Sequence, residues 1–115
     1  MSQSVAEILV DVLEKIGVRQ IFGLIGDSLN PFADAVRSSQ IEWIGAQHEE
    51  GAAPAASGQA KLTGGLGVCA GTTGPGSKHL VAGLYEAARR CTDPCSVRRH
   101  APPDAWYGLH SDDGA

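Results

Sequence analysis

The sequence predicts an α/β fold, in which a parallel sheet carries helices on both faces. Two observations lead to this prediction. Short apolar runs punctuated by glycine alternate along the chain with segments whose apolar residues recur at helical spacing. Polar or glycine-rich turns follow the apolar runs, as they do where a parallel strand leads into a crossover helix. Each crossover should be right-handed, so that helices cover both faces of the sheet.

The first helix is predicted over residues 5–16. Apolar residues recur there at helical spacing, and Gly17 follows at the position where helices end in the left-handed conformation. Ser4 is the expected N-cap, and Glu7 lies three residues later, where it completes a capping box. The apolar run 18–24 then predicts the first strand.

The second helix is expected to run to about Val36. Asp27 or Ser28 can cap its N-terminus, and Pro31 falls in the first turn, where proline is tolerated. The remaining elements follow the same alternation. They are a strand over 41–45, a helix over 48–62, a strand over 66–70, the loop GTTGPG and a helix over 77–89.

Pro54 departs from the pattern of the helix predicted over 48–62. A proline inside a helix removes one hydrogen bond and clashes with the preceding turn, at a cost of ~3 kcal/mol or more. We therefore expect either a late helix start, at Glu50 or Gly51, or a disturbed geometry around Glu49.

Composition favours one cytoplasmic domain and excludes several function classes. The chain has 115 residues, 43% of them hydrophobic, and a net charge of −4 with scattered Lys and Arg, so no nucleic-acid interface is expected. No apolar run approaches the ~20 residues that span a bilayer, and residues 1–17 lack the basic start of a signal peptide. Cys69 should be a small buried residue, and neither Cys91 and Cys95 nor His100 and His110 form a metal-ligand pattern.

Three segments fall at the carboxyl ends of the predicted strands, where open parallel sheets bind ligands. They are 26–28 (Gly-Asp-Ser), 47–49 (Gln-His-Glu) and 72–76 (Thr-Thr-Gly-Pro-Gly). Glu49 begins an Ala-rich helix, where a carboxylate faces the positive end of the helix dipole. The residues alone leave open whether Glu49 serves a cofactor or only caps its helix.

The order of five short motifs resembles a known family. GDSLN, IEW, HEE, VCAG-x-x-GPG and HL occur in the order found in thiamine-diphosphate enzymes of the pyruvate oxidase and pyruvate dehydrogenase (quinone) type. The chain is more distantly similar to acetolactate synthases. The resemblance covers residues 1–90 and implies an incomplete copy of the N-terminal pyrimidine-binding domain of these enzymes.

The resemblance implies roles for particular residues. Glu49, which follows His48 as in the family motif, would be the catalytic carboxylate that bonds the ring nitrogen of the aminopyrimidine. Gly26 and the loop residues Thr73, Gly74, Pro75 and Gly76 would lie against the cofactor. Asp27 and Ser28 would lie near the substrate, although a helix cap is the expected role of Ser28. His79 is expected on a helix surface, with the active-site entrance as the alternative.

The resemblance also implies partners that this chain does not hold by itself. Another domain of the relatives binds the diphosphate and Mg²⁺, so the missing phosphate loop is expected, and FAD belongs to the full-length relative alone. The substrate would be pyruvate, and subunits would meet through the Ala-rich helix 48–62 in a homo-oligomer. The chain should not turn over substrate alone.

Residues 91–115 are polar, with no apolar run of strand length, and are expected to be an irregular tail; two interpretations apply. One is a disordered tail. The other is a shifted reading frame, because residues 106–114 admit codons that, read one base later, spell GTDYIQTT, a family-like string. Two non-enzymatic alternatives remain for the whole chain: a fragment or interaction module that pairs with full-length subunits, and a flavodoxin-like nucleotide binder, which would need a phosphate loop after the first strand.

Overall fold

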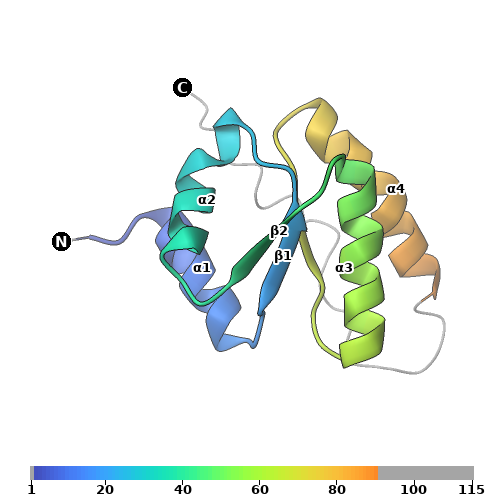
Figure 1. Ribbon diagram of the computed structural model, residues 1–115, viewed down its shortest axis with the longest axis horizontal. Helices are drawn as coiled ribbons and strands as arrows, with labels where there is room; N and C mark the ends of the chain where they lie inside the picture. The colour runs from blue at the N-terminus through green and yellow to red at the C-terminus, as the bar shows by residue number, and fades with distance from the viewer. Residues whose placement is uncertain (1, 91–115) are drawn as a thin grey trace.

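A computed structural model describes residues 2–90, with the side chains of 88–90 excepted. The chain forms a three-stranded sheet between two layers of helices (Figure 1). In chain order, the elements are α1 (Val5–Lys15), β1 (Gln20–Gly23), the 3-10 turn η1 (Asp27–Leu29), α2 (Asn30–Arg37), β2 (Glu42–Gly45), α3 (Glu49–Thr63), β3 (Val68–Ala70) and α4 (Pro75–Arg90).

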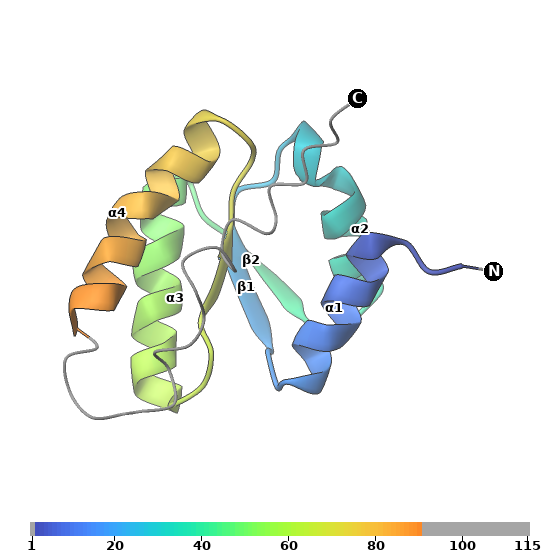
Figure 2. The same ribbon diagram turned by 180° about the vertical axis from the view of Figure 1, so that it is seen from behind.

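All strands are parallel, in the order β2-β1-β3. The central strand places Ile21 opposite both Trp43 of β2 and Val68 of β3. Helices α1 and α2 cover one face and α3 and α4 the other, as the two opposite views show (Figures 1 and 2). The α/β fold predicted from the sequence is therefore confirmed. The first strand is shorter than predicted at both ends, and the third begins two residues later than predicted.

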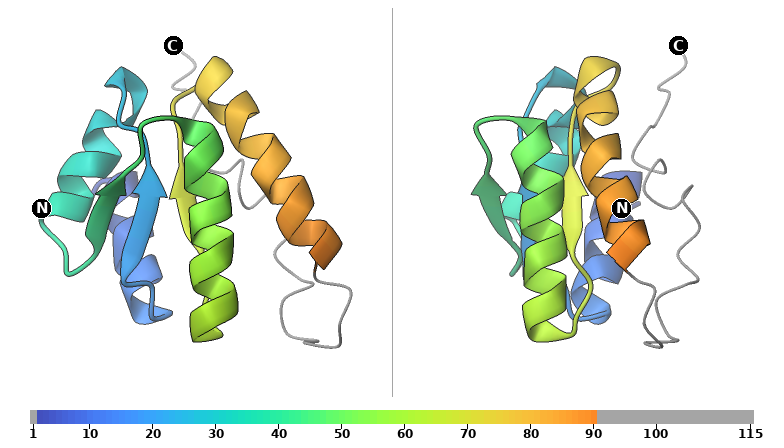
Figure 3. Two further views of the ribbon diagram at one scale, coloured as in Figure 1. Left: turned by 45° about the vertical axis from the view of Figure 1, so that its right-hand side comes forward. Right: turned by 90° about the vertical axis from the view of Figure 1, so that its right-hand side faces the viewer.

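Each face of the sheet has its own apolar core. Larger side chains fill the core under α1 and α2, where Ile21 and Val36 are almost completely buried. Small residues fill the other core, in which Ala52, Ala53 and Ala56 of α3 lie against β3 and α4. Figure 3 shows α3 and α4 side by side over that face. Methyl-sized side chains let these two helices approach closely.

The predicted start and end of α1 are confirmed. The Ser4 hydroxyl accepts from the Glu7 backbone N–H at 3.2 Å, and the Ser4 N–H donates to the Glu7 carboxylate at 2.7 Å, which completes the capping box. Gly17 follows the helix with a φ of 93°, a left-handed conformation that glycine adopts without strain.

The predicted capping of the second helix is wrong. The chain makes the turn η1 before α2, and Gly26 is the N-cap of that turn. The N-cap of α2 is Leu29, and neither start has a side-chain cap, so Asp27 and Ser28 do not cap α2. Pro31 does fall in the first turn of α2, as predicted.

Pro54 does not delay or disturb α3, contrary to expectation. The helix begins at Glu49 and runs without a break through Pro54 to Thr63. Packing against α4 explains this tolerance, since Gly83 leaves room for the proline ring: a Cβ at position 83 would lie 2.9 Å from Cδ of Pro54. The contacts of the packed helix offset the hydrogen bond that proline removes.

The last helix begins two residues earlier than predicted. Gly74, with a φ of 72°, makes the turn, and Pro75 is the first helical residue, a position that suits proline. The Ser77 hydroxyl donates to the Gly74 carbonyl at 3.1 Å. Pro75 and Gly76 thus belong to the first turn of α4 and not to the preceding loop. The predictions for residues 91–115 lie outside the described residues.

Within the described part of the chain, no helix is both long enough and apolar enough to cross a membrane.

Candidate functional site

The three segments at the carboxyl ends of the strands come together at one edge of the sheet. A Cβ on Gly26, after β1, would collide with the Thr72 side chain, after β3, so these two segments are in close contact. The Thr73 N–H donates to the Ser28 hydroxyl at 3.3 Å. Glu49, after β2, lies beside the same β3–α4 segment, at Gly76. The sequence order alone had predicted this convergence, because parallel strands end at the same edge.

Glu49 is the one buried charged residue in the described chain, with 7% of its surface exposed. Its side chain lies against bare backbone. A Cβ added to Gly76 would stand 3.1 Å from the Glu49 Oε1, and one added to Gly71 would stand 3.3 Å from the Glu49 Cγ. Glycine at both positions therefore leaves space around the carboxylate. Glu50, by contrast, is an exposed side chain, as expected one residue further round the helix.

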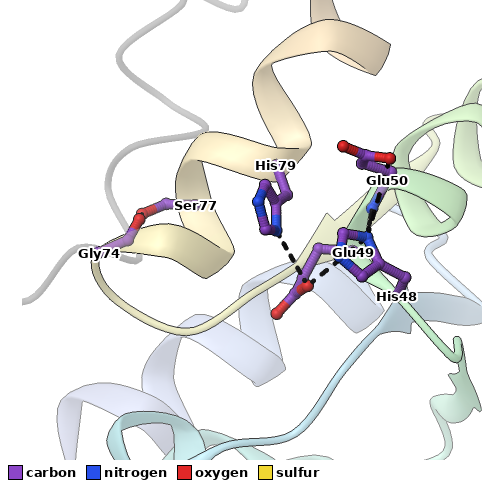
Figure 4. Close-up of polar contacts among 6 residues, drawn as sticks. All are labelled: His48, Glu49, Glu50, Gly74, Ser77 and His79. Carbon is purple, nitrogen blue, oxygen red and sulfur yellow. Dashed lines mark hydrogen bonds and ion pairs between the residues drawn. The ribbon is translucent and has the colours of Figure 1, made fainter.

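Two imidazoles border the Glu49 carboxylate (Figure 4). The Nδ1 of His79 is 3.6 Å from the Glu49 Oε2, and the Nδ1 of His48 is 4.0 Å from the same oxygen. The ring centroids of the two histidines are 4.6 Å apart, with an angle of 33° between the planes. Both imidazoles are about half exposed, so the cluster opens toward solvent on their side.

The structure shows what places each histidine. His48 is the N-cap of α3, and its Nδ1 accepts from the Glu50 backbone N–H at 3.2 Å. His79 lies in the second turn of α4, and its helix packs beside α3. The sequence expectation of a helix-surface position for His79 missed the contact with Glu49. The spacing of 30 residues gives no local signal, although the HL motif had suggested the active-site entrance.

The remaining candidates differ in what they contact. Gly26 is required for the close approach of two loops, and Gly76 is buried beside Glu49. Thr73, Gly74 and Pro75 are exposed at the rim. A Cβ on Gly74 would meet no atom within 4 Å, so the left-handed turn alone accounts for glycine there.

Asp27 and Ser28 are also exposed at the rim, but only Ser28 joins two segments of the site. Thr72 belongs to the predicted segment 72–76, but no role of its own was predicted for it from the sequence. It contacts both Gly26 and Gly76, because a Cβ on Gly76 would lie 2.6 Å from the Thr72 Oγ1. The Thr72 side chain therefore lies between the segment that follows β1 and the start of α4.

The local electrostatics disfavour a phosphate at the N-terminus of α3. Glu49 and Glu50 both occupy the first turn of α3, so this helix N-terminus carries carboxylates where an anion would bind. Neither a Gly-Lys-Ser/Thr phosphate loop nor a Gly-Asp-Gly motif occurs in the sequence. A hollow of about 390 Å³ between α1 and α2 lies apart from this edge and is lined by none of the rim residues.

The residues present fit one part of thiamine diphosphate. Glu49 is a buried carboxylate beside Gly71 and Gly76, and a Cβ on either glycine would crowd it. A carboxylate in such a place suits the edge of an aminopyrimidine ring. The described residues do not fit the diphosphate or its Mg²⁺, for which they offer neither a phosphate loop nor an all-oxygen ligand set.

Comparison with known proteins assigns this fold to a family of thiamine-dependent enzymes. Residues 3–93 match the family described as thiamine pyrophosphate enzyme, N-terminal TPP binding domain. The chain belongs to this family.

Relatives with different activities match the same part of the chain. The chain is 46% identical over 81 residues to pyruvate oxidase of Lactiplantibacillus plantarum, a match that covers 69% of this chain and 13% of that protein. It is 42% identical over 82 residues to the acetolactate synthase isozyme 2 large subunit of Escherichia coli. That match covers 71% of this chain and 15% of that protein. An uncharacterized 42.6 kDa protein of Pseudomonas amyloderamosa is 43% identical over 99 residues. That match covers 85% of this chain and 25% of that protein.

The chain thus spans between 13% and 25% of the length of these relatives. Oxidase and synthase match it to a similar degree. The comparisons therefore establish the domain family, and with it the thiamine cofactor of that family, but not one reaction.

Proposed function

We propose that the chain binds the aminopyrimidine ring of thiamine diphosphate through Glu49, as the ring-binding part of a longer enzyme. The burial of this carboxylate between Gly71 and Gly76, at the edge where all three strands end, carries the proposal. When bound, the cofactor supplies the carbon that reacts with the substrate and the amine that deprotonates it. The protein's task at this edge is to favour the reactive tautomer of the ring.

Glu49 can perform that task with one carboxylate. Its oxygens accept a hydrogen bond from a protonated ring nitrogen, and a proton shared along that bond can move to and from the ring. The backbone of Gly71 and Gly76 covers the buried side of the Glu49 side chain, and the Leu80 side chain lies beside Gly71. His48 and His79 border its open side, where they can orient the Oε2.

Calorimetric titration of the 115-residue chain tests this function. Because the chain holds only the ring, thiamine and thiamine diphosphate should bind with similar affinity, and Mg²⁺ should change neither. Glu49→Gln removes a charge-assisted hydrogen bond of about 1.5–3 kcal/mol, so binding should weaken roughly 10- to 100-fold.

Glu50→Gln is the matched control, because Glu50 is the exposed neighbour in the same first turn. It should bind thiamine like the wild type. Equal affinities of wild type and Glu49→Gln, with circular dichroism showing both to be folded, would contradict the proposal. So would binding that requires both the diphosphate and Mg²⁺, since another set of residues would then hold the cofactor.

For the longer enzyme we propose decarboxylation of pyruvate with electron transfer to an acceptor, as in flavin-containing oxidases. The motifs GDSLN, IEW and VCAG support this choice. Acetolactate synthesis is the alternative, because oxidase and synthase relatives match the chain to a similar degree. The protein encoded by the complete locus should release CO₂ from pyruvate and reduce a dye acceptor. Acetolactate as the main product would favour the alternative. Reading the same locus downstream also tests the frame-shift hypothesis.

A second candidate function is a module that pairs with another subunit, in a homo-oligomer or on a full-length relative. One surface of α3 favours it: a Cβ on Gly51 or Gly58 would meet no atom within 4 Å, and Ala55 and Leu62 are exposed nearby. The buried alanines of α3, however, face α4 and the sheet. Light scattering after gel filtration should give a dimer mass that Ala55→Arg reduces to a monomer; a monomeric wild type would count against this role.

A further inference from the structure

We propose that His48, Glu49 and His79 form a binding site for a Zn²⁺-type transition-metal ion. One ligand atom from each residue, two imidazole nitrogens and one carboxylate oxygen, lies within 4.8 Å of the others. The proposal concerns this cluster alone and does not depend on thiamine binding.

The spacing of the ligand atoms is near that of a tetrahedral site. Metal–ligand bonds of about 2.0–2.1 Å place neighbouring ligand atoms roughly 3.3 Å apart. The His79 Nδ1 and the Glu49 Oε2 are already 3.6 Å apart, and the His48 Nδ1 is 4.0 Å from the same oxygen. All three ligand atoms lie within 4.8 Å of one another, so the widest gap must close to roughly 3.3 Å to hold one ion. Half-exposed imidazoles can make such shifts by rotation.

The rest of the fold holds the ligands in place. Glu49 is buried between Gly71 and Gly76, and Leu80 lies one residue after His79 in the core under α4. The Nδ1 of His48 already has a partner, because it accepts from the Glu50 N–H. Binding through the other ring nitrogen of His48 leaves that helix cap intact, and binding through Nδ1 replaces it.

The donor set selects among ions. Two imidazoles and one carboxylate suit Zn²⁺, Co²⁺ and similar ions, and three protein ligands leave a fourth position open to water on the exposed side. Mg²⁺ and Ca²⁺ prefer six or more oxygen ligands, so they should not bind here. The ion proposed for this cluster therefore differs from the Mg²⁺ that the family resemblance implies for the diphosphate.

Co²⁺ titration followed by visible absorption, with displacement by Zn²⁺, tests the site in the full chain without an affinity tag. The tail contains other potential ligands, so the background variant carries Cys91→Ser, Cys95→Ser, His100→Gln and His110→Gln, all outside the described fold. We expect one Co²⁺ per chain in that background, with visible bands of a tetrahedral nitrogen–oxygen site and no thiolate charge-transfer band. A hundredfold excess of Mg²⁺ should not displace it.

Two variants locate the ion. His79→Gln changes a partly exposed side chain, and Glu49→Gln changes the buried one. Each variant should weaken Zn²⁺ binding at least about tenfold, because changes around metal ligands typically lower metal affinity by that factor or more. Glu50→Gln is the control and should bind Zn²⁺ normally. The proposal is overturned if the background variant binds no Co²⁺, if binding survives His79→Gln unchanged, or if only chains with the tail ligands bind.

Discussion

Gly83 of α4 lies so close to Ala53 of α3 that a Cβ at position 83 would stand 2.5 Å from the Ala53 Cβ. This contact sets the distance between the helix that begins at Glu49 and the helix that carries His79. The position of both site residues therefore depends on the absence of one methyl group.

Gly83→Ala should lower the free energy of unfolding by about 1–3 kcal/mol, because overpacking at a backbone contact exceeds the helix-propensity gain of alanine. Denaturant unfolding measures the change. Gly58→Ala is the matched control: its added Cβ meets nothing within 4 Å, so it should stabilise the chain by about 0.5–1 kcal/mol. A stabilising Gly83→Ala would show that the two helices are not in this contact.

The capping box of α1 predicts a pH-dependent contribution to stability. Hydrogen bonds from the Ser4 backbone N–H and then the Ser4 side chain lower the pKa of Glu7 below its ordinary 4.5. A lowered folded-state pKa means that the contribution of Glu7 is present above pH 4.5 and is lost as the pH falls through the folded-state pKa.

Unfolding at pH 7 and at pH 3 separates the two partners. Glu7→Gln should destabilise α1 at pH 7 and make little difference at pH 3. Ser4→Ala should lower the free energy of unfolding by about 1 kcal/mol at pH 7. Stability should still depend in part on pH in this variant, because the backbone N–H of residue 4 can still bond the Glu7 carboxylate. An equal effect of Glu7→Gln at both pH values would argue against the carboxylate bond.

Cys69 should be inert in the folded chain. Burial in β3 raises the pKa of its thiol from 9.0 to about 11. In a Cys91→Ser, Cys95→Ser background, a disulfide reagent at pH 8 should react at least ~100-fold more slowly with folded than with urea-unfolded protein. Fast reaction in the native state would mean that β3 is accessible.

The same raised pKa makes stability fall in alkaline solution. The unfolded thiol ionises first, so the folded state loses stability as the pH rises from about 9 to 11, by roughly 1.4 kcal/mol per pH unit. Cys69→Ala should remove this part of the alkaline slope. An unchanged slope in that variant would assign the effect to other groups.

The Ser28 hydroxyl connects the ends of β1 and β3 through the Thr73 N–H. Ser28→Ala should cost about 0.5–1 kcal/mol and raise the amide exchange rate of Thr73 several-fold, with little change at the amides of α1. Ser28→Thr, which keeps a hydroxyl, is the control. Unchanged exchange at Thr73 in the alanine variant would contradict the bond.

The two proposed ligands of the Glu49 cluster should compete. Zn²⁺ and an aminopyrimidine ring both require the Glu49 carboxylate, so saturating Zn²⁺ should weaken thiamine binding at least tenfold, and chelation should restore it. His79→Gln should bind thiamine in the presence of Zn²⁺ almost as well as in its absence. Simultaneous binding of both ligands to the wild type would exclude a shared carboxylate.

Local sequence determined the elements and their order. The Ser4–Glu7 box, the turn at Gly17 and the alternation of strand and helix are short-range signals, and all are present in the structure. The meeting of three loops at one edge also followed from the sequence, since parallel strands necessarily end together. Glu49 stood out for the same reason, as an acid at a strand-to-helix junction.

Tertiary packing decided the rest. Pro54 is tolerated within α3 because Gly83, 29 residues later, leaves space for its ring. Ser28 bonds Thr73 and not its own helix because the two loops meet at Gly26. His79 reaches Glu49 only because α4 lies beside α3, so the charge, space and donor geometry of this cluster arise from contacts between residues far apart in the chain, which no local spacing encodes.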